Sequence, residues 1–290
     1  MSTIETTVGM LNSGQPRERT ERLVLEVMNL ARESDAKCVE LVKAGVISKL
    51  FSILDPQICA TESIILPIMV IISNIAAVEE NHDEMVREGA ILQLIWVLSN
   101  SPSDAAKGSA AVALGNLATN FVYSRQIGDE PRGIPSLVEY LRNSATDVGK
   151  GKAAGTLWNL CDKNNVQNKQ KIVHAGGIEP LVDLLTNGTP ISQEYACGAL
   201  AKLASESAVG KLIVKAGAIP PLVSILTNGT QLGKQHSTLA LRNLSTNQNH
   251  KVFIRREMAN PNPNPRLHPN LRTLTLTLTP NLSIKTARYL

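Results

Sequence analysis

Asparagine recurs at a near-constant interval along most of the chain, and this residue type at this spacing could form hydrogen bonds in series. The positions are Asn29, Asn74, Asn116, Asn159 and Asn243, with Lys202 where the interval predicts another member. Successive members are 41 to 45 residues apart. A side-chain amide both donates and accepts, so it can pair with a backbone N–H and a backbone C=O together. An ammonium only donates, so we expect Lys202 to contact an acidic or carbonyl group.

Catalytic and metal chemistry have no comparable support in the sequence. The cysteines are Cys38, Cys59, Cys161 and Cys197, and no pair has Cys-X-X-Cys spacing or a histidine at a zinc-ligand offset. We expect each to be a small core residue. No phosphate-binding loop, Gly-X-Ser-X-Gly or His-Glu-X-X-His motif occurs. The sequence therefore predicts a protein that is not an enzyme and uses no cofactor and no metal.

The elements that would position the asparagines follow from a repeated phrase. Four copies place a glycine two residues before an isoleucine, at Gly45, Gly89, Gly176 and Gly217. Because glycine adopts positive φ at little cost, each copy predicts a sharp turn between a short first helix and a second helix. A damaged copy spans 130–134, where Gly128 and Pro131 are expected to shorten or break the first helix.

Each phrase leads into an apolar second helix and then a longer third helix. Prolines at 135, 180, 220 and 221 are expected in the first turn of the second helix, where a missing N–H is harmless. Asn187-Gly188 and Asn228-Gly229 are expected to end that helix with a left-handed residue. The third helix shows a period of 3.6, and no single unit can bury such a face alone. The sequence thus predicts units that stack into a solenoid.

Units of about 42 residues with three helices, a glycine turn and a terminal Asn-Leu-Ala resemble the armadillo repeat. The matching phrases are Gly-Ala-Ile-Pro-Pro-Leu-Val at 217–223, Ala-Leu-Gly-Asn-Leu-Ala at 113–118 and Leu-Arg-Asn-Leu-Ser at 241–245. Among armadillo proteins, the copies look most like those of the vacuolar-inheritance and plant-type proteins. The resemblance implies an all-α, right-handed superhelical solenoid of three-helix units. HEAT repeats are the structural alternative, but they usually lack this glycine turn and asparagine position.

The resemblance also implies a binding site. In this family the asparagine position lies on the inner, concave groove, and its amides hold the backbone of an extended peptide. Side chains seven residues earlier would add specificity. The implied groove comprises Asn29, Asn74, Asn116, Lys152, Asn159, Tyr195, Lys202, His236 and Asn243. The alternative is that each amide satisfies a neighbouring helix end. Lysines recur nine residues before the asparagine position, at Lys107, Lys150 and Lys234. They would either form a basic rim that attracts acidic partners or simply be solvent-exposed at the starts of the third helices.

We therefore predict a scaffold or adaptor that binds extended segments of other proteins. One alternative is the substrate-binding portion of an armadillo-type ubiquitin ligase that lacks its catalytic module. A nuclear-import adaptor is the weaker alternative, because such adaptors place tryptophan four residues before the asparagine. Those positions here hold Val70, Val112, Gly155, Gly198 and Leu239.

Composition divides the chain into three parts. We expect a flexible N-terminus at 1–16, an armadillo array at 17–254 and a low-complexity, disordered tail at 255–290. The array would hold a partial N-terminal unit, five units and the start of a truncated sixth. The tail carries six basic residues and one acidic residue, which leaves 23 basic and 24 acidic residues in 1–254. The basic balance therefore belongs to the tail and does not indicate nucleic-acid binding.

The remaining expectations concern compartment and assembly. No uninterrupted apolar run reaches 18 residues, and the first residues lack a basic and apolar leader. We expect no membrane insertion and a cytoplasmic location, with the nucleus as a second compartment. We expect a monomer. Solenoids need a polar cap at the C-terminal end, and we expect this array to lack one, so that end is the surface through which self-association could occur.

Overall fold

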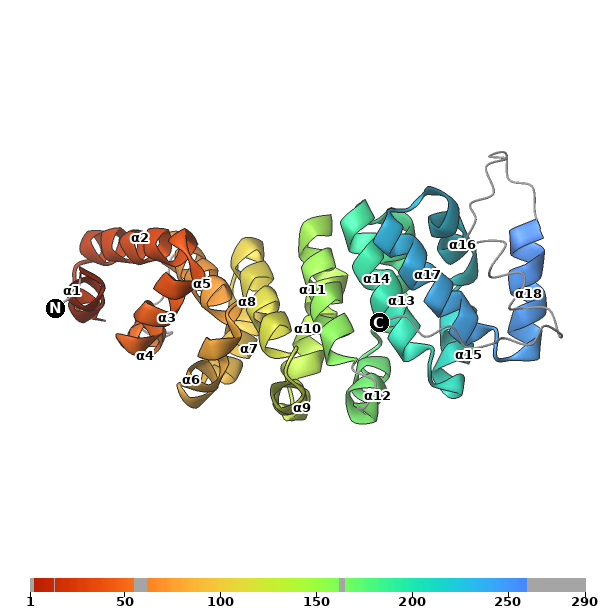
Figure 1. The fold of residues 1–290 in the computed structure, drawn as a ribbon, viewed down its shortest axis with the longest axis horizontal. Helices are drawn as coiled ribbons and strands as arrows, with labels where there is room; N and C mark the ends of the chain where they lie inside the picture. Colours follow the sequence, from red (N-terminus) through yellow and green to blue (C-terminus); the bar gives the residue numbers. More distant parts are fainter. Residues whose placement is uncertain (1–2, 13, 55–61, 162–164, 260–290) are drawn as a thin grey trace. The chain divides into compact units, whose positions relative to one another are not determined.

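The regular secondary structure in the described part of the chain is helical. The computed structural model describes residues 3–12, 14–54, 62–161 and 165–259 (Figure 1). Within these ranges every element is helical, which confirms the predicted all-α class. The chain divides into two compact units, unit 1 (Met1–Gly177) and unit 2 (Ile178–Leu290).

In unit 1, the third helix of each repeat packs against the third helix of the next. These third helices are α2 (Arg17–Glu33), α5 (Glu62–Ala76), α8 (Asp104–Leu117) and α11 (Asp147–Leu160). The first helices are α3 (Asp35–Lys43), α6 (His82–Arg87, after the 3-10 turn η1, Glu79–Asn81), α9 (Phe121–Asp129) and α12 (Val166–His174). The second helices are α4 (Val46–Ile53), α7 (Ala90–Asn100) and α10 (Gly133–Asn143).

Unit 2 repeats the same order. It contains the second helices α13 (Ile178–Asn187) and α16 (Ile219–Asn228), the first helices α15 (Ser207–Lys215) and α18 (Gln248–Ala259), and the third helices α14 (Pro190–Leu203) and α17 (Gln231–Leu244). The third helices α14 and α17 lie side by side (Figure 1). Each unit therefore presents a layer of adjacent third helices.

The predicted glycine turns are confirmed. Gly45, Gly89, Gly176 and Gly217 are the described residues with positive φ, at 78°, 79°, 76° and 83°. Each joins a first helix to a second helix, and L side chains rarely adopt this conformation. The predicted prolines also lie within the first turns of α10, α13 and α16.

The expected left-handed stops after the second helices are wrong. Gly229 is extended, with φ −73° and ψ 173°, and Gly188 does not have positive φ either. The glycines are needed for a different reason. A Cβ at Gly188 would lie 2.5 Å from the carbonyl oxygen of Leu184, and one at Gly229 would lie 2.6 Å from that of Ile225. Close backbone approach, not left-handed geometry, requires glycine at these helix ends.

The damaged copy keeps a first helix of ordinary length. Helix α9 has nine residues, as α12 and α15 do, and it runs through Gly128 before ending ahead of Pro131. A Cβ at Gly128 would lie 1.8 Å from Oδ1 of Asn168. Asn168 is buried and donates to the Ser124 carbonyl at 2.9 Å. Gly128 therefore makes room for a neighbouring buried amide and does not break the helix.

Hydroxyl groups at the starts of third helices connect successive repeats. Ser103, Thr146 and Thr230 cap α8, α11 and α17 by accepting a backbone N–H of the first turn. Each hydroxyl also donates to a carboxylate on the preceding third helix. The pairs are Ser103 with Glu62 at 2.8 Å, Thr146 with Asp104 at 3.2 Å, and Thr230 with Glu194. These carboxylates therefore help to hold neighbouring repeats in register.

Small aliphatic residues fill the interior of this chain, in which aromatic residues make up only 3% of the sequence. Ala110, Ala113, Leu114 and Leu117 of α8 are fully buried, which lets neighbouring helices approach closely. The expected core role of the cysteines is confirmed at Cys38, Cys161 and Cys197, which are buried. Burial raises the pKa of the Cys197 thiol to about 12. Cys59 lies outside the described residues.

Both ends of the array differ from expectation. Within 1–16, which we expected to be flexible, helix α1 (Thr3–Met10) buries Ile4 and Val8 against α2 and α3. At the other end, Arg255–Ala259 continue α18, so the helix extends into the segment assigned to the tail. The apolar patterns of α1 and α18 are too short to show a period that predicts either boundary. Residues 260–290 lie outside the described part of the chain.

Candidate functional site

The asparagine row, meaning Asn29, Asn74, Asn116, Asn159, Lys202 and Asn243, lies on the third helices. Three members donate Nδ2 to a backbone carbonyl of the preceding third helix: Asn116 to Ser73 at 3.4 Å, Asn159 to Gly115 at 2.8 Å, and Asn243 to Ala201 at 2.9 Å. In each case the acceptor immediately precedes the previous member of the row. The same contact therefore recurs from repeat to repeat in both units.

These carbonyls belong to the last turns of α5, α8 and α14, where helical carbonyls lack an intrahelical partner. The alternative in which the amides satisfy a neighbouring helix end is therefore correct for one N–H of each amide. The second N–H and Oδ1 have no partner among the described residues. All three side chains are half-buried, so this remaining capacity lies at the surface of the third-helix layer.

The first two members of the row differ from the others. Asn29 on α2 is exposed and Asn74 on α5 is half-buried, and the side-chain amide of neither hydrogen-bonds to another described residue. Among the described elements α1 precedes α2, and α1 is not a third helix. The sequence places all members in one class, whereas the structure separates those bound to a neighbouring helix from those that are not.

The residues seven positions before the row lie on the same side of each third helix, because seven residues make nearly two full turns. Lys152 extends over Gly108 of α8, where a Cβ would lie 3.1 Å from its Cδ and 3.3 Å from its Nζ. His236 places Nδ1 3.2 Å from the carbonyl oxygen of Glu194. Tyr195 is half-buried on α14.

The structure therefore brings the predicted groove residues together in two sets. Asn74, Asn116, Lys152 and Asn159 share the layer formed by α5, α8 and α11 in unit 1. Tyr195, Lys202, His236 and Asn243 share the α14–α17 layer in unit 2.

An apolar position on the same face was not predicted from the sequence. Val148, Ile191 and Leu232 lie eleven residues before the row on α11, α14 and α17, with exposed fractions of 60%, 60% and 40%. Eleven residues make almost three helical turns, so these side chains lie on the row side of their helices. Their recurrence at intervals of 43 and 41 residues is the signal that could have identified them.

The predicted basic rim lies elsewhere on the third helices. Lys107, Lys150 and Lys234 are half-buried and make no ion pair with a described residue. Nine residues correspond to about two and a half turns, so these lysines lie on the side of the helix opposite to the row. They are separate from the groove residues.

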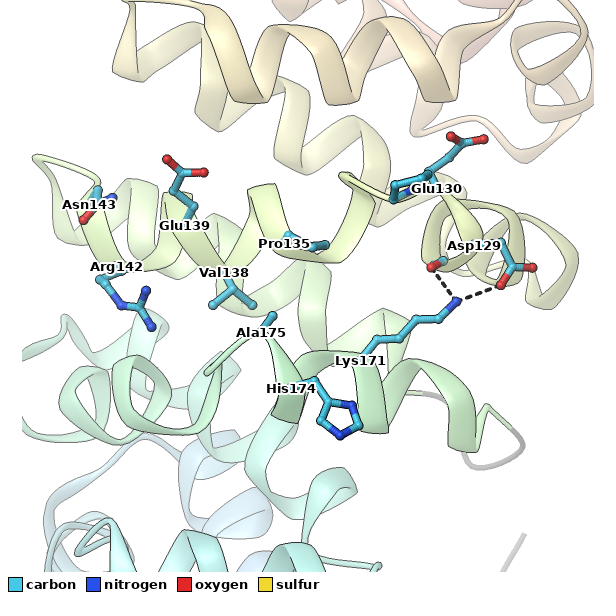
Figure 2. A pocket seen from close by; sticks show the side chains of 12 residues that line it. Asp129, Glu130, Pro135, Val138, Glu139, Arg142, Asn143, Lys171, His174 and Ala175 are labelled. Carbon is cyan, nitrogen blue, oxygen red and sulfur yellow. Dashed lines mark hydrogen bonds and ion pairs between the residues drawn. The ribbon is translucent and has the colours of Figure 1, made fainter.

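A concave region lies among α9, α10 and α12, with a volume of about 660 Å³ (Figure 2). Lys171 crosses it to Asp129 at 2.8 Å and to the Gly128 carbonyl at 2.7 Å. This hydrogen bond from Lys171 holds the pKa of the Asp129 carboxyl below its usual value. Arg142 donates to the Gly176 carbonyl at 3.2 Å. Both cations of this groove are therefore already bound within the fold.

Within the described ranges, no cluster of three or more His, Cys, Asp or Glu side chains is arranged to hold a metal ion. Nor does any single described helix combine the length and apolar composition needed to cross a bilayer. Two sharply bent pairs, Glu62–Ala76 with Glu79–Arg87 and Ser207–Lys215 with Ile219–Asn228, reach that length and composition only together.

The Armadillo/beta-catenin-like repeat family model matches residues 165–205 and 211–246. These two segments are similar to armadillo repeats. The first match includes α12 and α14, and the second includes α16 and α17, so both contain a glycine turn and a row position. No curated protein matches the chain at a significant level.

Solved armadillo structures share the fold. An engineered protein is 25% identical, with a TM-score of 0.76 over 85% of this chain and 100% of its own. A designed armadillo repeat protein is 24% identical, with a TM-score of 0.74 over 83% of this chain and 99% of its own. Another designed armadillo repeat protein, solved in complex with the peptide (KR)4, is 24% identical, with a TM-score of 0.73 over 84% and 100%. These likenesses confirm the armadillo-repeat solenoid fold.

Proposed function

We propose that the chain is a protein-interaction scaffold that binds extended segments of other proteins along its third-helix layers. The observation that carries this proposal is the orientation of the amides at Asn116, Asn159 and Asn243. One N–H of each is bound to the neighbouring repeat, which fixes the side chain. The free Oδ1 and second N–H then face a partner without first having to be ordered, and such preorganisation favours binding.

The spacing suits an extended chain. Packed helices lie about 8–10 Å apart, which corresponds to about three residues of extended backbone at about 3.3 Å each. Consecutive row members would therefore meet every third residue of the partner. Because they address the backbone, the partner's side chains would be read by neighbours such as Lys152, Tyr195 and His236.

The comparisons support this proposal by analogy. One of the similar designed proteins is solved with the peptide (KR)4, and another was designed for modular peptide recognition. Kinship with the vacuolar-inheritance and plant-type armadillo proteins belongs to the same proposal, as do a cytoplasmic or nuclear location and a monomeric state. The ubiquitin-ligase and import-adaptor alternatives gain no specific support from the contacts of the third helices.

The proposal is tested with peptides selected by display of random twelve-residue segments on the full chain. Titration calorimetry then compares Asn159→Ala with Asn100→Ala. Asn100 is an exposed asparagine of α7 whose amide also donates to a carbonyl, that of Trp96, so it is a matched control away from the row. Loss of a hydrogen bond worth about 0.5–1.5 kcal/mol predicts roughly two- to tenfold weaker binding for Asn159→Ala.

Asn100→Ala should leave the affinity unchanged. Selected peptides that bind Asn159→Ala as tightly as the wild type would show that the row does not contact the partner.

A further inference from the structure

The row face, meaning the third-helix positions at the row and four, seven and eleven residues before it, has a distinctive charge. On α5, α8 and α11, Lys152 is the sole charged side chain at these positions. On α14 and α17, the sole charged side chain is Lys202. Neither layer places a carboxylate at a row-face position. A face of this composition favours anionic over cationic side chains on a partner.

Two carboxylates at the starts of the third helices in this layer are already used within the fold. Asp104 accepts from the hydroxyls of Ser144 and Thr146 at 3.1 and 3.2 Å, and Glu62 accepts from Ser103 at 2.8 Å. These contacts hold successive repeats together at the starts of the third helices. Lys152 itself makes no ion pair with a described residue. Its charge is therefore not neutralised from within the layer.

Lys152 is also held at the junction between two repeats. Its stem lies against Gly108 of α8, where the absence of a side chain provides the space. The Tyr140 hydroxyl lies at the same glycine, 3.0 Å from the position of a Cβ, and donates to the Asp104 carbonyl at 2.9 Å. Burial raises the pKa of Tyr140 to about 12, so its hydroxyl stays neutral beside the ammonium.

The ammonium therefore lies between α8 and α11, the same two helices that Asn159 joins through its 2.8 Å bond to Gly115. Seven residues of helix separate Lys152 from Asn159, about 10 Å along the axis. A segment whose backbone meets Asn116 and Asn159 would direct side chains along α11 toward Lys152 and then toward the exposed Val148.

From these contacts we propose that the α8–α11 part of the groove recognises acidic side chains of its partner, with Lys152 as the contacting cation. This deepens the proposed function and rests on it. The partner is an extended protein segment carrying aspartate or glutamate. It is thus opposite in charge to the (KR)4 peptide bound by the designed relative.

The test uses three labelled eight-residue peptides, (ED)4, (KR)4 and (QS)4, with binding to the full chain measured by fluorescence anisotropy. The variant is Lys152→Gln and the matched control is Lys150→Gln. Both substitutions remove one positive charge from α11, but the two side chains point about 200° apart around the helix. Any contribution of the basic residues in 255–290 to peptide binding is the same in both variants.

We expect (ED)4 to bind more tightly than (KR)4, and Lys152→Gln to weaken (ED)4 binding by about fivefold, the effect of losing one ion pair of about 1 kcal/mol. Lys150→Gln should bind (ED)4 as the wild type does. Higher salt should weaken the binding of (ED)4 to the wild type, because the contact is between charges.

Two results would overturn the acidic preference but leave the proposed function intact: tighter binding of (KR)4, or equal effects of the two lysine substitutions. In either case Asn159→Ala would still weaken binding of the peptide that binds best. If none of the three peptides binds, or if Asn159→Ala has no effect on any of them, the proposed function itself falls.

Discussion

Replacing row asparagines by alanine should change stability in an order set by the hydrogen bonds between repeats. The Nδ2 to carbonyl distance is 2.8 Å for Asn159 and 3.4 Å for Asn116, whereas Asn74 has no such bond to a described residue. All three belong to unit 1 and are half-buried on third helices. Asn74 is therefore a control inside the row, with the same chemistry and a similar environment.

The magnitude follows from two opposing contributions. Alanine is a better helix former than asparagine by up to about 0.7 kcal/mol, and this gain is common to all three substitutions. A neutral hydrogen bond contributes about 1 kcal/mol, so Asn159→Ala should be about 1 kcal/mol less stable than Asn74→Ala. Asn116→Ala should lie between them, because its bond is longer and weaker.

Urea unfolding followed by circular dichroism measures these differences. With an m-value of about 2 kcal/mol/M, a difference of about 1 kcal/mol separates the two midpoints by about 0.5 M. The m-values should agree among the variants, so that midpoint shifts report stability alone. Equal midpoints for Asn159→Ala and Asn74→Ala would refute the conclusion that the row amides bind neighbouring repeats together.

Two further predictions concern the turns and the pH dependence of stability. Gly217→Ala should destabilise the protein by about 1–2 kcal/mol, because φ is 83° and a Cβ would meet no atom within 4 Å, so that backbone strain is the whole cost. The control is Gly9→Ala in α1, where φ is not positive and the space is equally open, and this substitution should be neutral or slightly stabilising. Equal urea unfolding curves for Gly217→Ala and Gly9→Ala would contradict the turn assignment. The Lys171 contact lowers the pKa of Asp129 in the folded state below its usual 3.8. It should therefore stabilise the fold above that pH and lose this effect as the pH falls through the lowered pKa. The ordinary pKa of an aspartate lies between pH 3 and pH 5. When the pH is lowered from 5 to 3, the urea midpoint of Asp129→Asn should therefore fall less than the urea midpoint of the wild type.

The local structure of the repeats could be predicted from the sequence because it depends on residues close together in the chain. The glycine phrase determines the turns at Gly45, Gly89, Gly176 and Gly217, since no other residue type adopts positive φ as readily. The 3.6 period determines the third helices and the common register of the row. The same local reasoning was wrong at Gly188 and Gly229, where a nearby carbonyl, and not the backbone angle, excludes a side chain.

The sequence by itself determined which residues recur on one face of each third helix, because a helical repeat converts equal spacing into equal position. It did not determine what those residues contact. Whether an amide is bound to the preceding repeat, as Asn159 is, depends on the approach of two helices more than 40 residues apart in the chain. The same holds for Lys152, whose place over Gly108 arises only when α8 and α11 pack together. The spacing of residues along a chain does not specify how distant segments pack against each other. In this protein, that packing determines which polar groups remain available to a partner.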